Sequence, residues 1–349
     1  AYNEYISQMR AMKAADTGAA AQLMAEDVRF YRHKLQQRII RESDCVQPLD
    51  VGRVVPAILR FASDLLGVEL RPALAASTWH GSVRVYDVVD RSAFLGRLYL
   101  DLHRRIGKPS TPLAIGFHVG ARGRRWPEAI LSAQLPDADR GELMGYGHIR
   151  ELLHELGHVL HIICAGHRER VGLMLPEPDF MEAPPQVLER FAGDARTLPE
   201  LAGTPPNPSC DGTITEALSI GEAYRLRQNL VAAEFALRLH MQEVRDTSPE
   251  DLYRAIGVKY QFPGDPPGSS FPASMPHLAM ENYCATYFVY LHTEAMAAQM
   301  FELFWKSSKL ATAGRRFRQL ILQRGGSQPA RKSLLDFRAA MGSQSHPAR

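Results

Sequence analysis

The hydrophobic and polar positions of this 349-residue chain change period several times, and each period predicts a type of element. Residues 4–43 are rich in Ala, Met, Leu, Gln, Arg and Glu, which predicts one or two helices. Pro48 interrupts this pattern, and an apolar stripe at helical spacing resumes over 51–66 and ends at Gly67. The N-terminal part of the chain is therefore expected to be helical.

The period shortens to two residues after Trp79, as expected for strands. Alternating apolar residues predict a strand at 83–89, with 94–102 as its hairpin partner across a short polar turn. Residues 113–119 and 129–135 are two further candidate strands, separated by a turn rich in Gly and Arg. A small antiparallel or mixed sheet is therefore predicted. An open edge of this sheet could pair with an extended peptide, or the sheet could be purely structural.

Helical spacing returns after the sheet. A helix is predicted from Met144 or His148 to Cys164, and a second one ends at Phe191. The remaining predicted segments are a surface loop at 199–211, a helical stretch at 214–245, a loop at 263–276 and a helix at 283–307. The sequence thus predicts a mainly α fold with a small β-sheet, in the α+β class.

The composition is that of a soluble globular protein, with 45% hydrophobic and 23% charged residues. A net charge of +3 with interleaved signs gives no reason to expect nucleic acid or a membrane surface as a partner, and no segment approaches 18 apolar residues. Four scattered cysteines argue against a disulfide scaffold or a cysteine zinc site, and they favour a reducing compartment. Together with the lack of a visible targeting segment, this predicts an intracellular location, cytoplasmic or mitochondrial. The basic residues near the C-terminus are expected on solvated helix faces: Arg315, Arg316, Arg318, Arg324, Arg331, Lys332 and Arg338.

The predicted helix that ends at Cys164 contains the pattern His-Glu-x-x-His. At 3.6 residues per turn, His154 and His158 lie one turn apart on the same face, where two imidazoles can bind one zinc ion. Glu155 lies beside such an ion, where it could take a proton from zinc-bound water. The alternative is that two surface or core histidines flank a carboxylate by coincidence.

A catalytic zinc ion needs a third protein ligand. His161 continues the histidine face a further turn along the helix, so we interpret it as a packing residue or as a support for the ligands. A third histidine after a glycine turn is excluded, because that pattern needs a His where this chain has Cys164. Glu182, 28 residues after His154, is the best candidate. Asp179 could accept the free N–H of a zinc-bound imidazole, or it could cap a helix.

Residues 154–161 and 179–186 together resemble the M3 metallopeptidases, the oligopeptidase family of thimet oligopeptidase, neurolysin and mitochondrial intermediate peptidase. Those proteins carry His-Glu-Phe-Gly-His and then Asp-Phe-x-Glu-x-Pro-Ser-Gln. The similarity covers most of residues 45–305 and includes Trp79-His80, Tyr99-Leu100-Asp101-Leu102 and His277-Leu278-Ala279. The resemblance implies a largely helical, zincin-like catalytic fold with a small sheet that borders a deep cleft.

The resemblance also implies the roles of individual residues. The implied zinc ligands are His154, His158 and Glu182, with Glu155 as the general base. His277, Tyr283 and Tyr290 would stabilise the reacting carbonyl or bind substrate, and Tyr287 would bind substrate. Tyr283, Tyr287 and Tyr290 are spaced to share one helix face, although such a stripe can also be a buried aromatic core.

Three parts of the sequence depart from the family pattern. Pro185 replaces the family's Ser, Met280-Glu281-Asn282 replace glycines, and Cys284 stands where Asp is common. The long N-terminal helical region usual in the family is also missing, so this sequence is expected to be a fragment or a shortened relative. We expect one M3-like region over 1–349, with a helical lead-in at 1–75, the sheet at 76–140 and a helical zinc- and substrate-binding part at 141–349.

The implied activity is zinc-dependent hydrolysis of internal bonds in short peptides, with one Zn²⁺ per chain. It could serve general degradation or the processing of one dedicated precursor. The alternative is a non-catalytic peptide-binding or scaffold protein that retains the zinc site as a relic.

Overall fold

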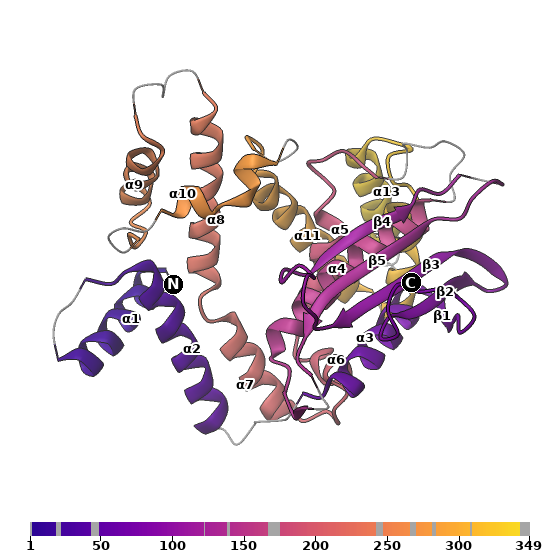
Figure 1. The fold of residues 1–349 in the computed structure, drawn as a ribbon, viewed down its shortest axis with the longest axis horizontal. Helices are drawn as coiled ribbons and strands as arrows, with labels where there is room; N and C mark the ends of the chain where they lie inside the picture. The colour runs from indigo at the N-terminus through magenta and orange to yellow at the C-terminus, as the bar shows by residue number, and fades with distance from the viewer. Residues whose placement is uncertain are drawn as a thin grey trace, which may run out of the picture. The chain divides into compact units, whose positions relative to one another are not determined.

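The computed structural model describes residues 2–18, 22–42, 49–121, 123–137, 140–166, 175–241, 247–265, 270–280, 284–307 and 309–342 (Figure 1). The chain divides into two compact units. Unit 1 comprises Ala1–Val46 and Pro208–His292, and unit 2 comprises Gln47–Asn207 and Thr293–Arg349. None of the helices in the described ranges is long and apolar enough to cross a membrane.

The regular secondary structure in the described residues of unit 1 is entirely helical. Its helices are α1 (Tyr2–Thr17), α2 (Ala25–Glu42), α7 (Pro208–Ser219), α8 (Glu222–Leu239), α9 (Pro249–Lys259), α10 (Phe271–Ser274) and the 3-10 turn η3 (Pro276–Ala279). The apolar faces of α1, α2, α8 and α9 meet in one core that includes Met9, Val28 and Phe235. Cys210 in α7 is disulfide-bonded, a pairing that the scattered cysteines did not predict.

Two predictions for this part of the chain were wrong. The helical stretch predicted at 214–245 breaks between α7 and α8 at Gly221, and its last residues lie outside the described ranges. Gly221 has a φ of 91°, and a Cβ there would lie 2.7 Å from Cδ of Arg32, so glycine suits this break. The loop predicted at 199–211 contains most of α6 (Leu198–Ala202, in unit 2) and the start of α7. Prolines in the first turn start a helix rather than break it, which explains this error.

The sheet of unit 2 has five strands in the order β1-β2-β3-β5-β4. The strands are β1 (Glu69–Pro72), β2 (Arg84–Asp90), β3 (Ala93–His103), β4 (Leu113–His118) and β5 (Glu128–Leu135). β3 and β5 pair in parallel and all other neighbours are antiparallel, so of the two predicted alternatives, antiparallel or mixed, the sheet is mixed. The short β1 was not predicted because its four residues are largely exposed and show no apolar alternation. β4 forms one edge of the sheet.

Helices complete unit 2. They are α3 (Val51–Leu66), α4 (Tyr146–Ala165), α5 (Ala183–Phe191), α6, most of α11 (Val289–Lys306), α12 (Leu310–Phe317), the π-helical turn η4 (Arg318–Leu322) and α13 (Ala330–Gly342). α4 packs on the sheet against β3, β4 and β5, and α5 packs on α4 (Figure 1). The helix predicted from Tyr283 begins only at Val289, because residues 284–288 form turns. The mainly helical fold with a small sheet is confirmed.

Arg318 corrects the expectation that the C-terminal basic residues all lie on solvated faces. Its side chain is buried and its guanidinium donates to Asp90 at 2.8 Å. Arg315, Arg331, Lys332 and Arg338 are exposed as expected. A buried guanidinium needs a carboxylate partner, and here that partner lies on a strand that is distant in sequence.

Candidate metal centre

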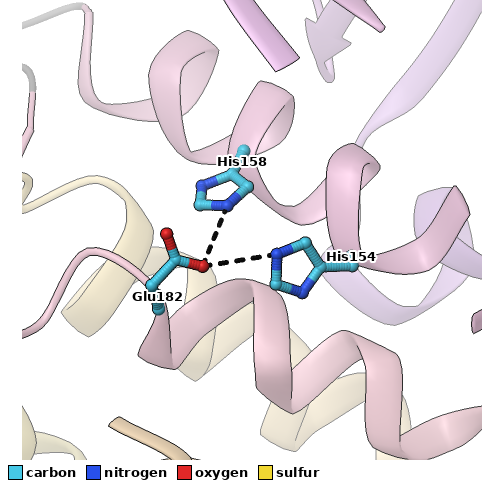
Figure 2. A group of neighbouring side chains, drawn as sticks. All are labelled: His154, His158 and Glu182. Atoms are coloured by element: carbon cyan, nitrogen blue, oxygen red, sulfur yellow. Dashed lines mark ion pairs between the residues drawn. The ribbon is translucent and has the colours of Figure 1, made fainter. Parts of the chain in front are cut away.

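Two helices of unit 2 bring the predicted metal ligands together. His154 and His158 project from successive turns of α4, with ring centroids 5.0 Å apart and planes at 78°. Glu182 immediately precedes α5, and its side chain makes no capping hydrogen bond to that helix. Figure 2 shows one Glu182 oxygen facing both rings: Oε2 lies 3.3 Å from Nε2 of His154 and 3.3 Å from Nε2 of His158.

This geometry fits a divalent metal ion. The three ligand atoms all lie within 4.8 Å of one another. Ligand atoms about 2.1 Å from a tetrahedral zinc ion lie about 3.4 Å apart, close to the two measured separations. Two imidazoles and one carboxylate are also the donor set of a catalytic zinc site that keeps one position for water. His154, His158 and Glu182 could therefore hold one zinc ion.

The close approach of α5 to α4 depends on Gly157, between the two histidines. A Cβ at Gly157 would lie 2.6 Å from Cα of Pro185, a distance that real Cβ atoms essentially never show. Any larger residue would push the start of α5 away from α4. Pro184 and Pro185 in the first turn of α5 suit a helix start, where a missing N–H leaves no bond unmade.

The charges of the site are coupled. Burial lowers the pKa of His154, but its hydrogen bonds to Glu182 and Glu189 outweigh burial and raise that pKa to about 10. Burial likewise raises the pKa of Glu182, but bonds to His154 and His158 outweigh it and hold the pKa well below its usual range. The carboxylate thus attracts positive charge, which a proton or a metal ion can supply.

Glu155 lies on α4 beside the ligands and also contacts the edge of the sheet. The backbone amide of Ala114 in β4 donates a hydrogen bond to its carboxylate. Burial raises the pKa of Glu155, while the nearby His154 and His158 oppose the rise. A half-buried carboxylate with a raised pKa accepts a proton more readily, which suits a general base.

A second carboxylate supports His154, and sequence reasoning missed it. Glu189, on α5, accepts at Oε2 from Nδ1 of His154 over 3.0 Å, and Arg150 bonds to its other oxygen. Asp179, the candidate considered for this role, is exposed. The spacing held a usable signal, because Glu189 lies seven residues after Glu182 and shares its helix face.

His161 does not join the ligand group. Its side chain is buried, and neither ring nitrogen has a hydrogen-bond partner among the described residues. Burial lowers the pKa of His161 to about 3, which keeps the ring neutral. Its burial and its lack of a hydrogen-bond partner among the described residues favour a packing role for His161 over support of a zinc ligand.

A separate aromatic cluster lies in unit 1. The hydroxyl of Tyr290 lies 3.3 Å from Nε2 of His277, and the rings of Tyr287 and Tyr290 are 5.0 Å apart. Burial raises the pKa of the Tyr287 hydroxyl, opposed by Arg225. Tyr283 lies outside the described residues. Because Tyr287 precedes α11, the predicted helix face of three phenols is wrong, although two of the phenols still meet His277.

Comparison with known proteins decides the family. The sequence profile of Peptidase family M3 matches residues 1–348. The chain belongs to this family. M3 members are metallopeptidases, which agrees with the donor set built by α4 and α5.

Curated M3 relatives are distant and longer. The "Thimet-like oligopeptidase" of Dictyostelium discoideum is 27% identical over 307 residues, which cover 81% of this chain and 45% of the relative. The "Mitochondrial intermediate peptidase" of Mus musculus is 26% identical over 345 residues, which cover 92% of this chain and 47% of the relative. The M3 chain described here thus spans less than half the length of these relatives.

A solved structure described under the name oligoendopeptidase F has a similar fold. It aligns with a TM-score of 0.52 at 14% identity, over 98% of this chain and 64% of that one. The likeness supports the mainly helical fold with a small sheet that is seen in this M3 chain.

Proposed function

We propose that this chain is the catalytic part of a zinc metallo-oligopeptidase that hydrolyses internal bonds of short peptides. The observation that carries the proposal is the convergence of His154, His158 and Glu182 at separations of 3.3 Å with Glu155 beside them. Membership of family M3 supports the reaction class. A zincin-like fold with a deep cleft belongs to the same proposal and rests on the family resemblance.

The chain's residues would divide the work as follows. His154, His158 and Glu182 would hold zinc, a Lewis acid that makes water nucleophilic near neutral pH and polarises a carbonyl group. Glu155 would take the proton of the attacking water and pass it to the leaving amine. The Ala114 amide would help to orient the Glu155 carboxylate for this transfer.

The roles of the unit 1 cluster rest on the family resemblance. His277, Tyr283 and Tyr290 would donate to the oxygen of the reacting carbonyl or bind substrate, and Tyr287 would bind substrate. Preorganised donors of this kind commonly contribute about 100- to 1,000-fold in rate. The hydrogen-bond distance between Tyr290 and His277 is compatible with joint action.

The substrates and location are proposed in the same way. Relatives carry the names of oligopeptidases and of a mitochondrial intermediate peptidase, which favour short peptides or a dedicated precursor as substrate. Either name is compatible with an intracellular location, in the cytoplasm or in mitochondria.

The test combines zinc content with cleavage of a mixed peptide library followed by mass spectrometry. Glu155→Gln should retain zinc and lower kcat by about 100- to 10,000-fold, because only the proton acceptor is removed. Glu151→Gln, an exposed residue one turn earlier on α4, is the matched control and should leave both unchanged. Zinc bound by the unaltered chain without any cleavage would favour the non-catalytic scaffold. Full activity of Glu155→Gln would remove the mechanism.

A further inference from the structure

The metal centre continues outward through one ion pair that bridges α4 and α5. Arg150 lies one turn before His154 on α4, and its Nε and one terminal nitrogen bond to Oε1 of Glu189. The other oxygen of Glu189, Oε2, lies 3.0 Å from Nδ1 of His154. Each oxygen of Glu189 therefore has a different partner, a guanidinium on one side and a metal-binding imidazole on the other.

The burial of Glu189 makes its ion pair with Arg150 important for the metal centre. The side chain of Glu189 is only 17% exposed, against 39% for Arg150. A carboxylate withdrawn from water keeps its charge only when cations or hydrogen-bond donors compensate it. Arg150 is suited to this because a guanidinium is always charged and is a rigid, planar donor. Its bonds to Oε1 leave Oε2 of Glu189 turned toward His154.

The orientation of Glu189 decides which nitrogen of His154 faces the metal site. An ionised carboxylate cannot donate, so Nδ1 of His154 must carry the hydrogen of the 3.0 Å contact. The lone pair of a neutral ring then lies on Nε2, the atom that faces Glu182. A ring that is fixed in this way binds a metal ion without first rotating or changing tautomer.

We propose that Arg150 is a positioning residue for the metal centre, which acts through Glu189 to hold His154 in its metal-binding orientation. The inference rests on the proposed function, because it assumes that the centre binds zinc. It goes beyond that function by assigning a role to a residue that is not among the candidate metal ligands. A different reading is that the ion pair only fastens α5 to α4, and the experiment separates the two.

The experiment measures zinc affinity of the full chain by competition with a chromophoric chelator. Arg150→Met and Glu189→Gln should each weaken zinc binding by about 10- to 100-fold, as expected for groups that orient a ligand. Arg150→Lys keeps the charge but not the planar donor, so it should restore only part of the affinity that Arg150→Met loses. The matched control is Arg104→Met, which breaks the surface ion pair with Glu142 of the same unit and should leave affinity unchanged.

The double variant is the decisive arm. Because Arg150 acts through Glu189, Arg150→Met should weaken binding no further once Glu189→Gln is present. The visible spectrum of the Co²⁺-loaded single variants should also change, since the orientation of His154 differs. A merely structural ion pair predicts unchanged affinity and spectrum in every variant that folds by circular dichroism.

Two outcomes would overturn the inference. Arg150→Met that binds zinc as tightly as the unaltered chain, or that weakens binding equally with and without Glu189→Gln, would exclude the route through Glu189. If Arg150→Met does not fold, Arg150→Lys is compared with Glu189→Gln instead. Zinc binding that is weakened as much by Arg150→Lys as by Glu189→Gln would contradict the argument that the positive charge of residue 150 supports Glu189. Absence of zinc binding in the unaltered chain would instead remove the proposed function and this inference together.

Discussion

Unit 2 contains two buried carboxylates with opposite kinds of partner. Asp101, in β3, is 4% exposed and accepts from Nε1 of Trp79 at 3.0 Å, from Nζ of Lys108 at 3.0 Å and from both terminal nitrogens of Arg105. Glu182 is 5% exposed and faces the imidazoles of the metal centre. The first carboxylate meets a guanidinium and an ammonium group, whereas the second meets two imidazole rings that can bind a metal ion once they are neutral.

The difference teaches how to tell a structural charge cluster from a metal site. The Arg105 guanidinium is always charged, and the bonds to Asp101 oppose the burial that lowers the pKa of Lys108, so the Asp101 cluster already supplies its own cations. Burial raises the pKa of Asp101, but bonds to Arg105, Trp79 and Lys108 outweigh it and hold the pKa well below its usual range. Imidazoles can release a proton and offer lone pairs, so the Glu182 cluster can exchange a proton for a cation.

The largest effect on stability is expected from Asp101→Asn. The change leaves Lys108, with a side chain 4% exposed, without its anion. Removing one partner of a buried ion pair typically lowers the free energy of unfolding by about 3 to 5 kcal/mol. Urea unfolding followed by circular dichroism measures the loss, and zinc affinity should not change. The control Asp87→Asn, which breaks a half-exposed pair with Arg97 on the same sheet, should cost less than about 1 kcal/mol. Equal losses in the two variants would contradict the comparison.

Glu182→Gln should show the reverse of Asp101→Asn, with a large loss of zinc affinity and a small loss of stability. Zinc affinity should fall by about 100-fold or more, since a direct ligand matters at least as much as a group that orients one. The free energy of unfolding without metal should change by less than about 1 kcal/mol, because His154 can release its proton and leaves no unpaired buried charge. Chelator competition and urea unfolding on one preparation measure both quantities. A large loss of stability with zinc binding intact would make Glu182 a structural residue.

Gly157→Ala should lower both the free energy of unfolding and the zinc affinity, because it acts on the distance between α4 and α5. The added Cβ would lie 2.6 Å from backbone Cα of Pro185, which cannot move without moving α5. We expect a loss of about 2 kcal/mol in the free energy of unfolding, typical of overpacking, together with weaker zinc binding. Gly147→Ala on the same helix has open space around its Cβ and should be neutral or slightly stabilising. A neutral Gly157→Ala would show that α5 tolerates displacement.

The sequence predicted features that depend on local pattern and missed those that depend on tertiary contact. The apolar stripe and Gly67 predicted α3 with its observed bounds, and the spacing of His154 and His158 predicted their shared face. The choice of Glu189 over Asp179 depends on how α5 turns against α4, which no local pattern contains. The burial of Arg318 depends on Asp90, 228 residues away. The period and spacing of residues therefore predict which side chains share one face of a helix or strand. Tertiary packing decides which of these faces contact each other.

The pH dependence of stability gives the smallest test of the comparison. The pKa of Asp101 is lower in the folded chain than in the unfolded chain, so its contribution is fully present above the unfolded value of about 3.9 and declines as pH falls below it. Between pH 5 and pH 3 this group alone should remove about 1 kcal/mol from the free energy of unfolding. Asp101→Asn should lack this part of the acid sensitivity, and Asp87→Asn should keep it. Identical acid profiles for the unaltered chain and Asp101→Asn would mean that the Asp101 cluster does not hold its charge as the bonds to Lys108 and Arg105 indicate.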